Sequence, residues 1–243
     1  MTELEITISD DLLKKVMRKY HYHEEDMEEL RQVADVLEGV LKGRSGFWCR
    51  LPGTGKPQMQ KTAEEHETAE EQGNSELQET MFVQVVMTLG AGVDELQNYY
   101  VDEEAFCECY MVETMGNELL LECYVEFNEW VARQSGWHVA RYHFFGSRED
   151  MPLEGMKEVL EHYRDTAVAC NDAYCLIPKM SVIFLAELTR DDQQICEGIC
   201  MGCGNRTCPN RMGGMEEQRW PNVPQRTLPY GYARILEHPG SRQ

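Results

Sequence analysis

The sequence has few basic residues and no long apolar segment. It holds 23 Lys and Arg against 43 Asp and Glu in 243 residues, a formal net charge of −20. This balance excludes nucleic acid and anionic membranes as partners, because their phosphate groups would be repelled. No apolar run reaches the roughly 18 residues of a membrane-spanning helix. The opening residues, MTELEITISDD, lack the apolar core of a signal peptide, so we expect a cytoplasmic protein.

The ten cysteines are the most informative residues that are present. In a reducing compartment they should be thiols or metal ligands rather than disulfides. Six are scattered among apolar neighbours and are interpreted as small buried side chains: Cys49, Cys107, Cys109, Cys123, Cys170 and Cys175. The other four lie close together towards the C-terminus: Cys196, Cys200, Cys203 and Cys208.

The apolar pattern predicts an α+β fold with a mixed or antiparallel sheet flanked by helices. Helical spacing is found at residues 10–20, 24–42, 92–100, 102–134 and 152–164, and extended segments at 47–51, 81–90, 137–145 and 173–188. The predicted parts of the chain are an N-terminal helical part (1–51), an acidic flexible loop (52–80), an α+β core (81–190) and a Cys-rich metal-binding segment with an irregular tail (191–243).

The cysteine cluster, CEGICMGCGNRTCPNR (196–211), has the spacing C-x3-C-x2-C-x4-C-P. Thiolates gathered at this density suit a soft metal, and the glycines between them let the backbone turn around a small centre. The four cysteines predict an iron–sulfur cluster, of the 4Fe-4S type, or a tetrahedral zinc ion. Metal-free thiols are the third possibility. The spacing also matches enzymes that cleave S-adenosylmethionine by radical chemistry, but the 35 residues after Cys208 are too few for their barrel.

Four phrases precede this cluster in a fixed order: VVMTLGAGVDELQNYY, TMGNELLLE, GSREDMPLEGMKEVLEHY and CLIPKMSVIFLAEL. In this order, and followed by a Cys-rich end, they resemble the activation domain of vitamin B12-dependent methionine synthase. More closely, the chain resembles the stand-alone bacterial members of that family, and the resemblance spans residues 81–211. It implies an α+β module that binds S-adenosylmethionine and presents it to cobalamin during reductive remethylation.

The resemblance also implies a set of cofactor-binding residues. Arg141 and Gly146 correspond to the family's Arg and to the glycine of its Pro-Gly-Tyr turn. Arg141 would pair with the carboxylate of S-adenosylmethionine, and Gly146 would allow close approach of the backbone. Pro178 and Ser181 correspond to positions in the family's Met-x-Pro-x-Lys-Ser phrase.

We therefore expect an accessory protein in cobalamin chemistry, which supports reductive activation of a B12-dependent methionine synthase or related methyltransferase. The chain has no recognisable B12-binding part, so the resemblance implies that a corrinoid-binding partner holds the cobalamin. Two positions depart from the family: Ser147 replaces Tyr and Met180 replaces Lys. They motivate the alternative of a non-enzymatic metal-binding module that has lost S-adenosylmethionine binding. A thiol-redox sensor built on the same cysteines is the third hypothesis.

Overall fold

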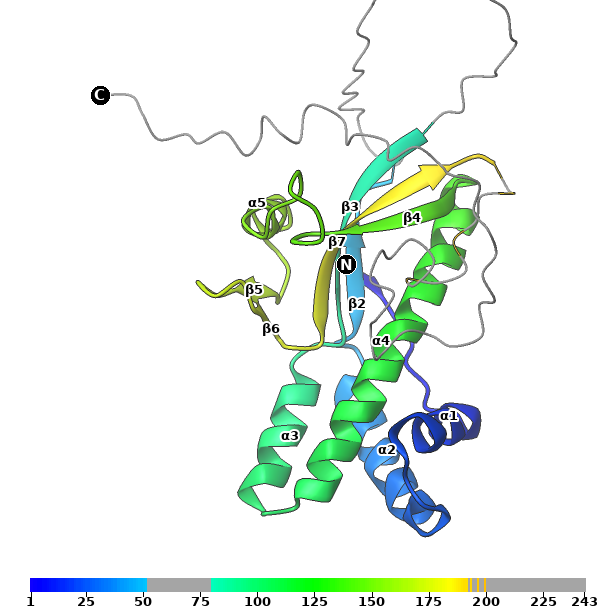
Figure 1. Ribbon diagram of the computed structural model, residues 1–243, viewed down its shortest axis with the longest axis vertical. Coiled ribbons are helices and arrows are strands. Elements are labelled where there is room, and N and C mark those ends of the chain that lie inside the picture. The colour runs from blue at the N-terminus through cyan, green and yellow to red at the C-terminus, as the bar shows by residue number, and fades with distance from the viewer. Residues whose placement is uncertain (52–79, 192, 194–195, 197–198, 200–243) are drawn as a thin grey trace, which may run out of the picture.

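The computed structural model describes residues 1–51, 80–191, 193, 196 and 199, and within them the fold is α+β (Figure 1). The helices are α1 (Asp10–Tyr20), a short 3-10 helix (Glu24–Asp26), α2 (Met27–Leu41), α3 (Gly92–Asp102), α4 (Phe106–Ser135) and α5 (Gly155–His162). The strands are β1 (Thr2–Glu3), β2 (Gly46–Cys49), β3 (Thr80–Thr88), β4 (His138–Phe144), β5 (Ala169–Cys170), β6 (Leu176–Ile177) and β7 (Ser181–Thr189).

Five of the described strands form one antiparallel sheet in the order β1-β2-β3-β7-β4. The central strands β3 and β7 pair along their full length, from Thr80 opposite Thr189 to Thr88 opposite Ser181. Both are rich in branched and aromatic residues, which favour extended backbone. Because side chains alternate along a strand, each of these strands packs against a layer on both faces.

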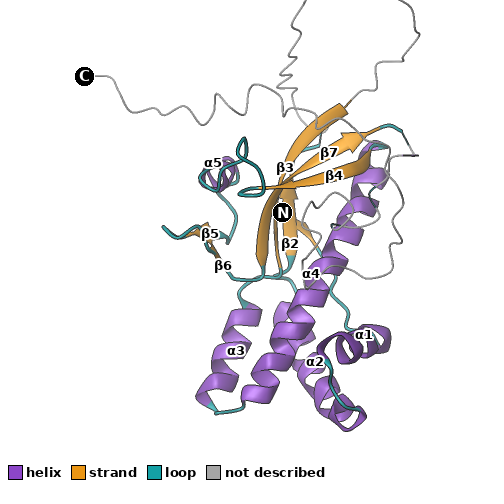
Figure 2. Ribbon diagram, viewed as in Figure 1, coloured by secondary structure: helices purple, strands orange, loops and turns teal. Residues whose placement is uncertain are grey.

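The first face of the sheet packs against the long helix α4, which runs alongside the sheet and then continues beyond it next to α1, α2 and α3 (Figure 2). Phe127 of α4 meets Phe47 and Phe184 of the sheet in edge-to-face ring contacts at 5.2 and 5.7 Å. Ring pairs of this geometry add about 0.5–1.5 kcal/mol to simple burial. This layer forms the main core of the described residues.

The second face is covered by α5 and by the β5–β6 hairpin, which lie on the other side of the sheet from α4 (Figure 1). Val86 and Ile183 of the sheet pack here against Val159 and Tyr163. The Tyr163 hydroxyl donates to the carbonyl of Gln84 at 2.9 Å, which ties α5 to β3. The segment between β4 and β7, which contains α5, β5 and β6, therefore forms a second, smaller layer on the sheet.

The structure confirms the α+β prediction and makes the described sheet fully antiparallel. Two predictions about single residues are wrong: Cys107 and Cys175 are exposed, not buried among apolar neighbours. Cys107 lies in the first turn of α4 and Cys175 in the β5–β6 turn, so neither faces the core. The predicted loop falls almost entirely on residues 52–79, which lie outside the described residues. None of the described helices is long and apolar enough to cross a membrane.

Candidate functional site at the β4 edge

The first cysteine of the cluster is held against strand β4, at the edge of the sheet. Cys196 is 1% exposed, and its backbone amide donates to the carbonyl of Val139 at 2.7 Å. The side-chain amide of Asn128, on α4, donates to the Cys196 carbonyl at 2.9 Å. An edge strand offers open backbone groups of this kind to an incoming segment. The start of the cluster is thus fixed by two separate elements.

A buried polar chain lies behind this anchor. The hydroxyl of Tyr142, on β4, donates to Asn128 Oδ1. Tyr142 thereby orients the Asn128 amide, which donates to the Cys196 carbonyl. Burial raises the pKa of Tyr142, and the nearby Cys196 and Tyr124 add to the rise. The phenol therefore stays neutral and acts as a donor. Sequence reasoning missed Asn128, because a single polar residue in a helical pattern carries no sign of its partner.

Of the four predicted metal ligands, only Cys196 lies within the described residues, so the metal centre stays a prediction. Cys200, Cys203 and Cys208 lie outside the described residues, and within the described part no group of three His, Cys, Asp or Glu side chains could hold a metal ion. The residue types fit the prediction, since clustered cysteine thiolates are soft donors. The choice between iron–sulfur and zinc stays open.

Arg141 lies on the opposite face of the same strand. A bulge between Val139 and Arg141 shifts the register, so that Val139 and Tyr142 both face α4 while Arg141 stands opposite Glu187 of β7. Beside it, His143 Nε2 lies 2.9 Å from Glu187 Oε2, and the His143 ring is 6% exposed. A buried His–Glu pair therefore neighbours the predicted carboxylate-binding Arg.

The His143–Glu187 pair is a feature that the sequence did not single out. Its signals were present: Arg141 and His143 alternate along β4, and Glu187 interrupts the apolar run of β7. The ring of Phe82 lies 5.7 Å from that of His143, which closes one side of the pair. A polar pair held by apolar neighbours in this way is oriented rather than mobile.

Gly146 has a structural role in the turn that follows β4. Its φ of +78° lies in the left-handed region, and its amide donates to the Met151 carbonyl at 2.6 Å. A Cβ built on this glycine would come within 2.8 Å of Leu153 Cδ2. The space next to Gly146 is thus filled by Leu153 in this structure, which leaves little room for a ligand against the Cα.

Pro178 and Ser181 lie where the β5–β6 layer joins β7. Pro178 is buried and follows a cis peptide bond, and the Ser181 hydroxyl lies 2.7 Å from that of Thr88. Between them, the Lys179 ammonium lies 2.6 Å from Glu113 of α4. Burial raises the pKa of Glu113, but hydrogen bonds from Lys179 and Gln97 outweigh it, and the net shift is downward. This segment therefore joins the sheet to α4.

The predicted cofactor-binding residues lie in two places along β7. Arg141 stands opposite Glu187, six residues along β7 from Ser181. At about 3.3 Å per residue this separates the two positions by roughly 20 Å along the strand. Cys196 binds to β4 through the Val139 carbonyl and packs into the main core, whereas Arg141 lies on the other face of the strand. The structure thus brings Arg141 close to Glu187 and His143, and it places Pro178 with Ser181 elsewhere.

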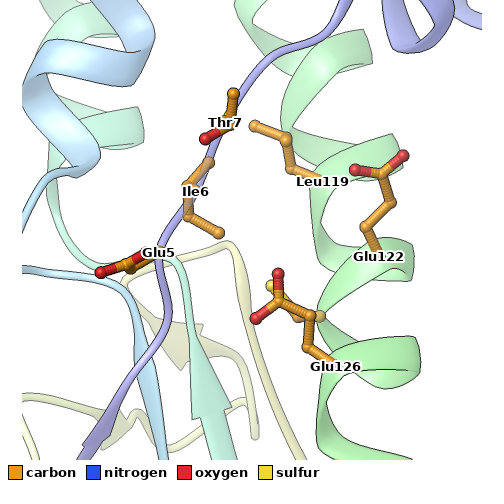
Figure 3. Close-up of a pocket in the computed structure, with 7 residues that line it drawn as sticks. Glu5, Ile6, Thr7, Leu119, Glu122 and Glu126 are labelled. Atoms are coloured by element: carbon orange, nitrogen blue, oxygen red, sulfur yellow. The ribbon is translucent and has the colours of Figure 1, made fainter. Parts of the chain in front are cut away.

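A small cavity of about 190 Å³ lies between residues 5–7 and α4 (Figure 3). Glu5, Glu122 and Glu126 surround it, with Cys123 in its wall. Burial raises the pKa of Cys123 to about 12, and the two nearby α4 carboxylates contribute. This thiol is therefore protonated at neutral pH and unreactive, so the cavity offers no nucleophile.

The fold and the β4 edge thus define a class: an antiparallel α+β domain whose edge strand anchors a Cys-rich segment. Comparison with protein-family models gives no match, and comparison with curated protein sequences gives none either.

Proposed function

We propose that the protein is an accessory factor in cobalamin chemistry, which supports the reductive remethylation of a corrinoid-dependent methionine synthase or a related methyltransferase. The observation that carries this proposal is the order of the four sequence phrases between residues 81 and 211, followed by the four-cysteine cluster. The α+β fold agrees with what that resemblance implies. The cobalamin would be held by the partner.

The geometry of β4 supports the proposal in one respect. This single strand carries Arg141 on one face and anchors Cys196 on the other, through Val139. Strand β4 is paired along its length with β7, and groups on a paired strand are positioned more precisely than groups on loops. Arg141, beside the buried His143–Glu187 pair, would bind the carboxylate of S-adenosylmethionine. The cysteine-bound centre would supply one-electron transfer if it is iron–sulfur, or hold the segment if it is zinc.

The reaction to be tested transfers one electron and one methyl group to the cobalamin. An added low-potential reductant supplies the electron that converts cob(II)alamin to cob(I)alamin. The cob(I)alamin then takes the methyl group of S-adenosylmethionine, giving methylcobalamin and S-adenosylhomocysteine. The assay mixes the full chain, purified without oxygen, with a methyltransferase loaded with cob(II)alamin, reductant and S-adenosylmethionine, and follows methylcobalamin by absorbance.

We expect the full chain to accelerate methylcobalamin formation, and Arg141→Ala to raise the KM for S-adenosylmethionine. Arg133→Ala is the matched control, because Arg133 is an exposed Arg in the last turn of α4 that pairs only with Glu129 among the described residues. Metal analysis and the absorption spectrum of the same sample distinguish iron–sulfur from zinc. No acceleration by wild-type protein would refute the proposal.

A second candidate function is a non-enzymatic metal-binding module of the same fold. It is favoured by the roughly 20 Å that separate Arg141 from Ser181 along β7, and by the Leu153 side chain that fills the space beside Gly146. Calorimetric titration with S-adenosylmethionine separates the two. Heat of binding that Arg141→Ala abolishes supports the first candidate, and metal-loaded protein that gives no heat supports the second.

A further inference from the structure

The end of the helical half exposes an unusual group of aromatic and apolar side chains. Tyr99, Val101, Phe106 and Tyr110 are four of the nine exposed large hydrophobic residues in the described part of the chain. All four lie around the turn from α3 to α4, at the end of the molecule farthest from the sheet (Figure 1). Phe106 is 65% exposed. Single exposed hydrophobics need no explanation, but a gathered set marks an interaction surface.

This surface continues into an apolar groove. The groove, of about 660 Å³, is lined by Met17, Tyr22 and Met27 and by the charged residues Lys14, Arg18 and Glu24. The ring of Tyr22 lies 6.0 Å from that of Tyr110, so the groove and the α4 aromatics adjoin. The Tyr22 hydroxyl lies 3.1 Å from that of Thr114, which fixes the ring in place. The Met and Tyr side chains of the groove suit contact with the apolar face of a helix.

The same end carries two neighbouring carboxylates. Glu29 of α2 and Glu108 of α4 are near enough for the charge of one to act on the other, and among the described residues neither makes an ion pair with Lys or Arg. Burial raises the pKa of Glu29, and Glu108 and Asp26 raise it further. Two neighbouring like charges disfavour each other. A cation placed between them would relieve that repulsion, and a guanidinium can bond both.

We propose that this helical-end surface, made of Tyr22, Glu29, Phe106, Glu108 and Tyr110, binds a cationic amphipathic helix of a partner protein. An Arg or Lys of that helix would sit between the two carboxylates, and its apolar face would lie against Phe106 and Tyr110. A second copy of this chain suits the surface less well, because a two-fold contact would bring the acidic groups together.

This surface is separate from the site at β4. From Glu108 to Asn128, the residue that holds Cys196, α4 runs for 20 residues, or about 30 Å. The proposal therefore goes beyond the cobalamin function and does not depend on it. Loss of peptide binding and loss of methylcobalamin formation would be different results from different variants.

The test uses the full chain and a defined probe: a fluorescently labelled helical peptide with Arg and Lys on one face and Leu on the other. A peptide of the same composition in scrambled order shares its charge but not its apolar face. Fluorescence polarisation at two salt concentrations gives the affinities. We expect the amphipathic peptide to bind at least about tenfold more tightly than the scrambled one, because the apolar face supplies the central contacts.

The variant Phe106→Ser/Tyr110→Ser should weaken binding of the amphipathic peptide about tenfold or more. Glu29→Gln/Glu108→Gln should weaken it and reduce its salt dependence, since exposed charges are screened. Val125→Ser and Glu161→Gln are matched controls, an exposed apolar and an exposed acidic residue outside this surface. Equal affinity for both peptides, no binding by wild-type protein, or equal loss in the controls would overturn the proposal. So would a dimer in sedimentation that Phe106→Ser/Tyr110→Ser dissociates.

Discussion

The carboxylate of Glu118, near the middle of α4, is buried and has three polar partners among the described residues. Its side chain has no exposed surface, yet it accepts hydrogen bonds from Lys19 Nζ at 2.6 Å and from the Tyr20 hydroxyl at 3.0 Å. The Lys15 ammonium lies 3.0 Å from its other oxygen. All three partners belong to α1. We therefore predict that Glu118 is the main polar link between α1 and α4.

The perturbation is Glu118→Gln, which keeps the shape of the side chain and removes its charge. Breaking a buried ion pair from one side costs about 3–5 kcal/mol, mostly because a buried charge is left unpaired. Here the lysines are 37% and 26% exposed and can turn to water, so the penalty is reduced. The amide oxygen still accepts one hydrogen bond. We expect a loss of about 2 kcal/mol in the free energy of unfolding.

The pH dependence gives a sharper test. Burial alone raises the pKa of Glu118, but hydrogen bonds from Lys19 and Lys15 outweigh it and hold the pKa below its ordinary 4.5. Because the pKa of Glu118 is lower in the folded protein than in the unfolded chain, its ionised form stabilises the fold at pH values above the unfolded-state pKa. That stabilisation is lost as the pH falls through the folded-state pKa. Wild type and Glu118→Gln should therefore differ most at neutral pH and converge as the pH falls below 4.5.

The assay is urea denaturation followed by circular dichroism over this pH range. Glu129→Gln is the matched control, because it makes the same change on the same helix in an exposed pair with Arg133. An exposed i,i+4 pair contributes about 0.3–0.5 kcal/mol, so this control should lose much less. If Glu118→Gln matches wild type at neutral pH, or if the gap does not narrow in acid, the ion-pair reasoning is wrong.

Two further predictions concern packing and thiol chemistry. Gly92→Ala should destabilise by about 1–3 kcal/mol, because its Cβ would lie 2.5 Å from the Val40 carbonyl oxygen, whereas Gly39→Ala, in open space on α2, should stabilise by about 0.5–1 kcal/mol. Thermal unfolding of the two variants checks this, and shifts of the same sign would contradict it. Brief alkylation at about pH 8, read by mass spectrometry, should label exposed Cys107 well before Cys123, whose pKa burial raises to about 12. Equal labelling in the native protein would contradict the assigned burial.

The elements that the sequence predicted are the ones with enough periodic positions to be recognised. The helix predicted at 10–20 has a regular apolar face, with Ser9 or Asp10 as its expected cap. It is α1, and Ser9 is the cap, with its Oγ accepting from the Leu12 amide. Strands β1 and β5 have two residues each, too few for any alternation to show. Such strands form because a neighbouring strand offers backbone groups, and that depends on tertiary contacts.

The site was predictable only as residue types. Cysteine spacing points to a soft metal without any structure, but nothing in the sequence shows that Asn128 and Val139 hold Cys196. The same limit applies to Glu118, which lies among apolar residues of a helix that the sequence predicted well. From the sequence alone, a carboxylate at this position indicates an exposed side chain. Only the structure shows that Lys15 and Lys19 of α1 pair with it. Long-range partners decide such cases, and helical periodicity does not contain them.

Helix α4 joins these observations into one physical argument. Its first turns contribute Phe106, Glu108 and Tyr110 to the helical-end surface. Its middle binds α1 through Glu118, and Asn128 towards its C-terminal end binds Cys196. Buried side chains recur along it from Met111 to Val131, so the helix is packed over most of its length. Energies of substitutions separated by more than about 10 Å and without shared partners usually add. Phe106→Ser and Asn128→Ala should therefore act independently: the first on partner binding and the second on the cysteine segment. A combined variant that departs from additivity would show that α4 transmits a change between its two ends.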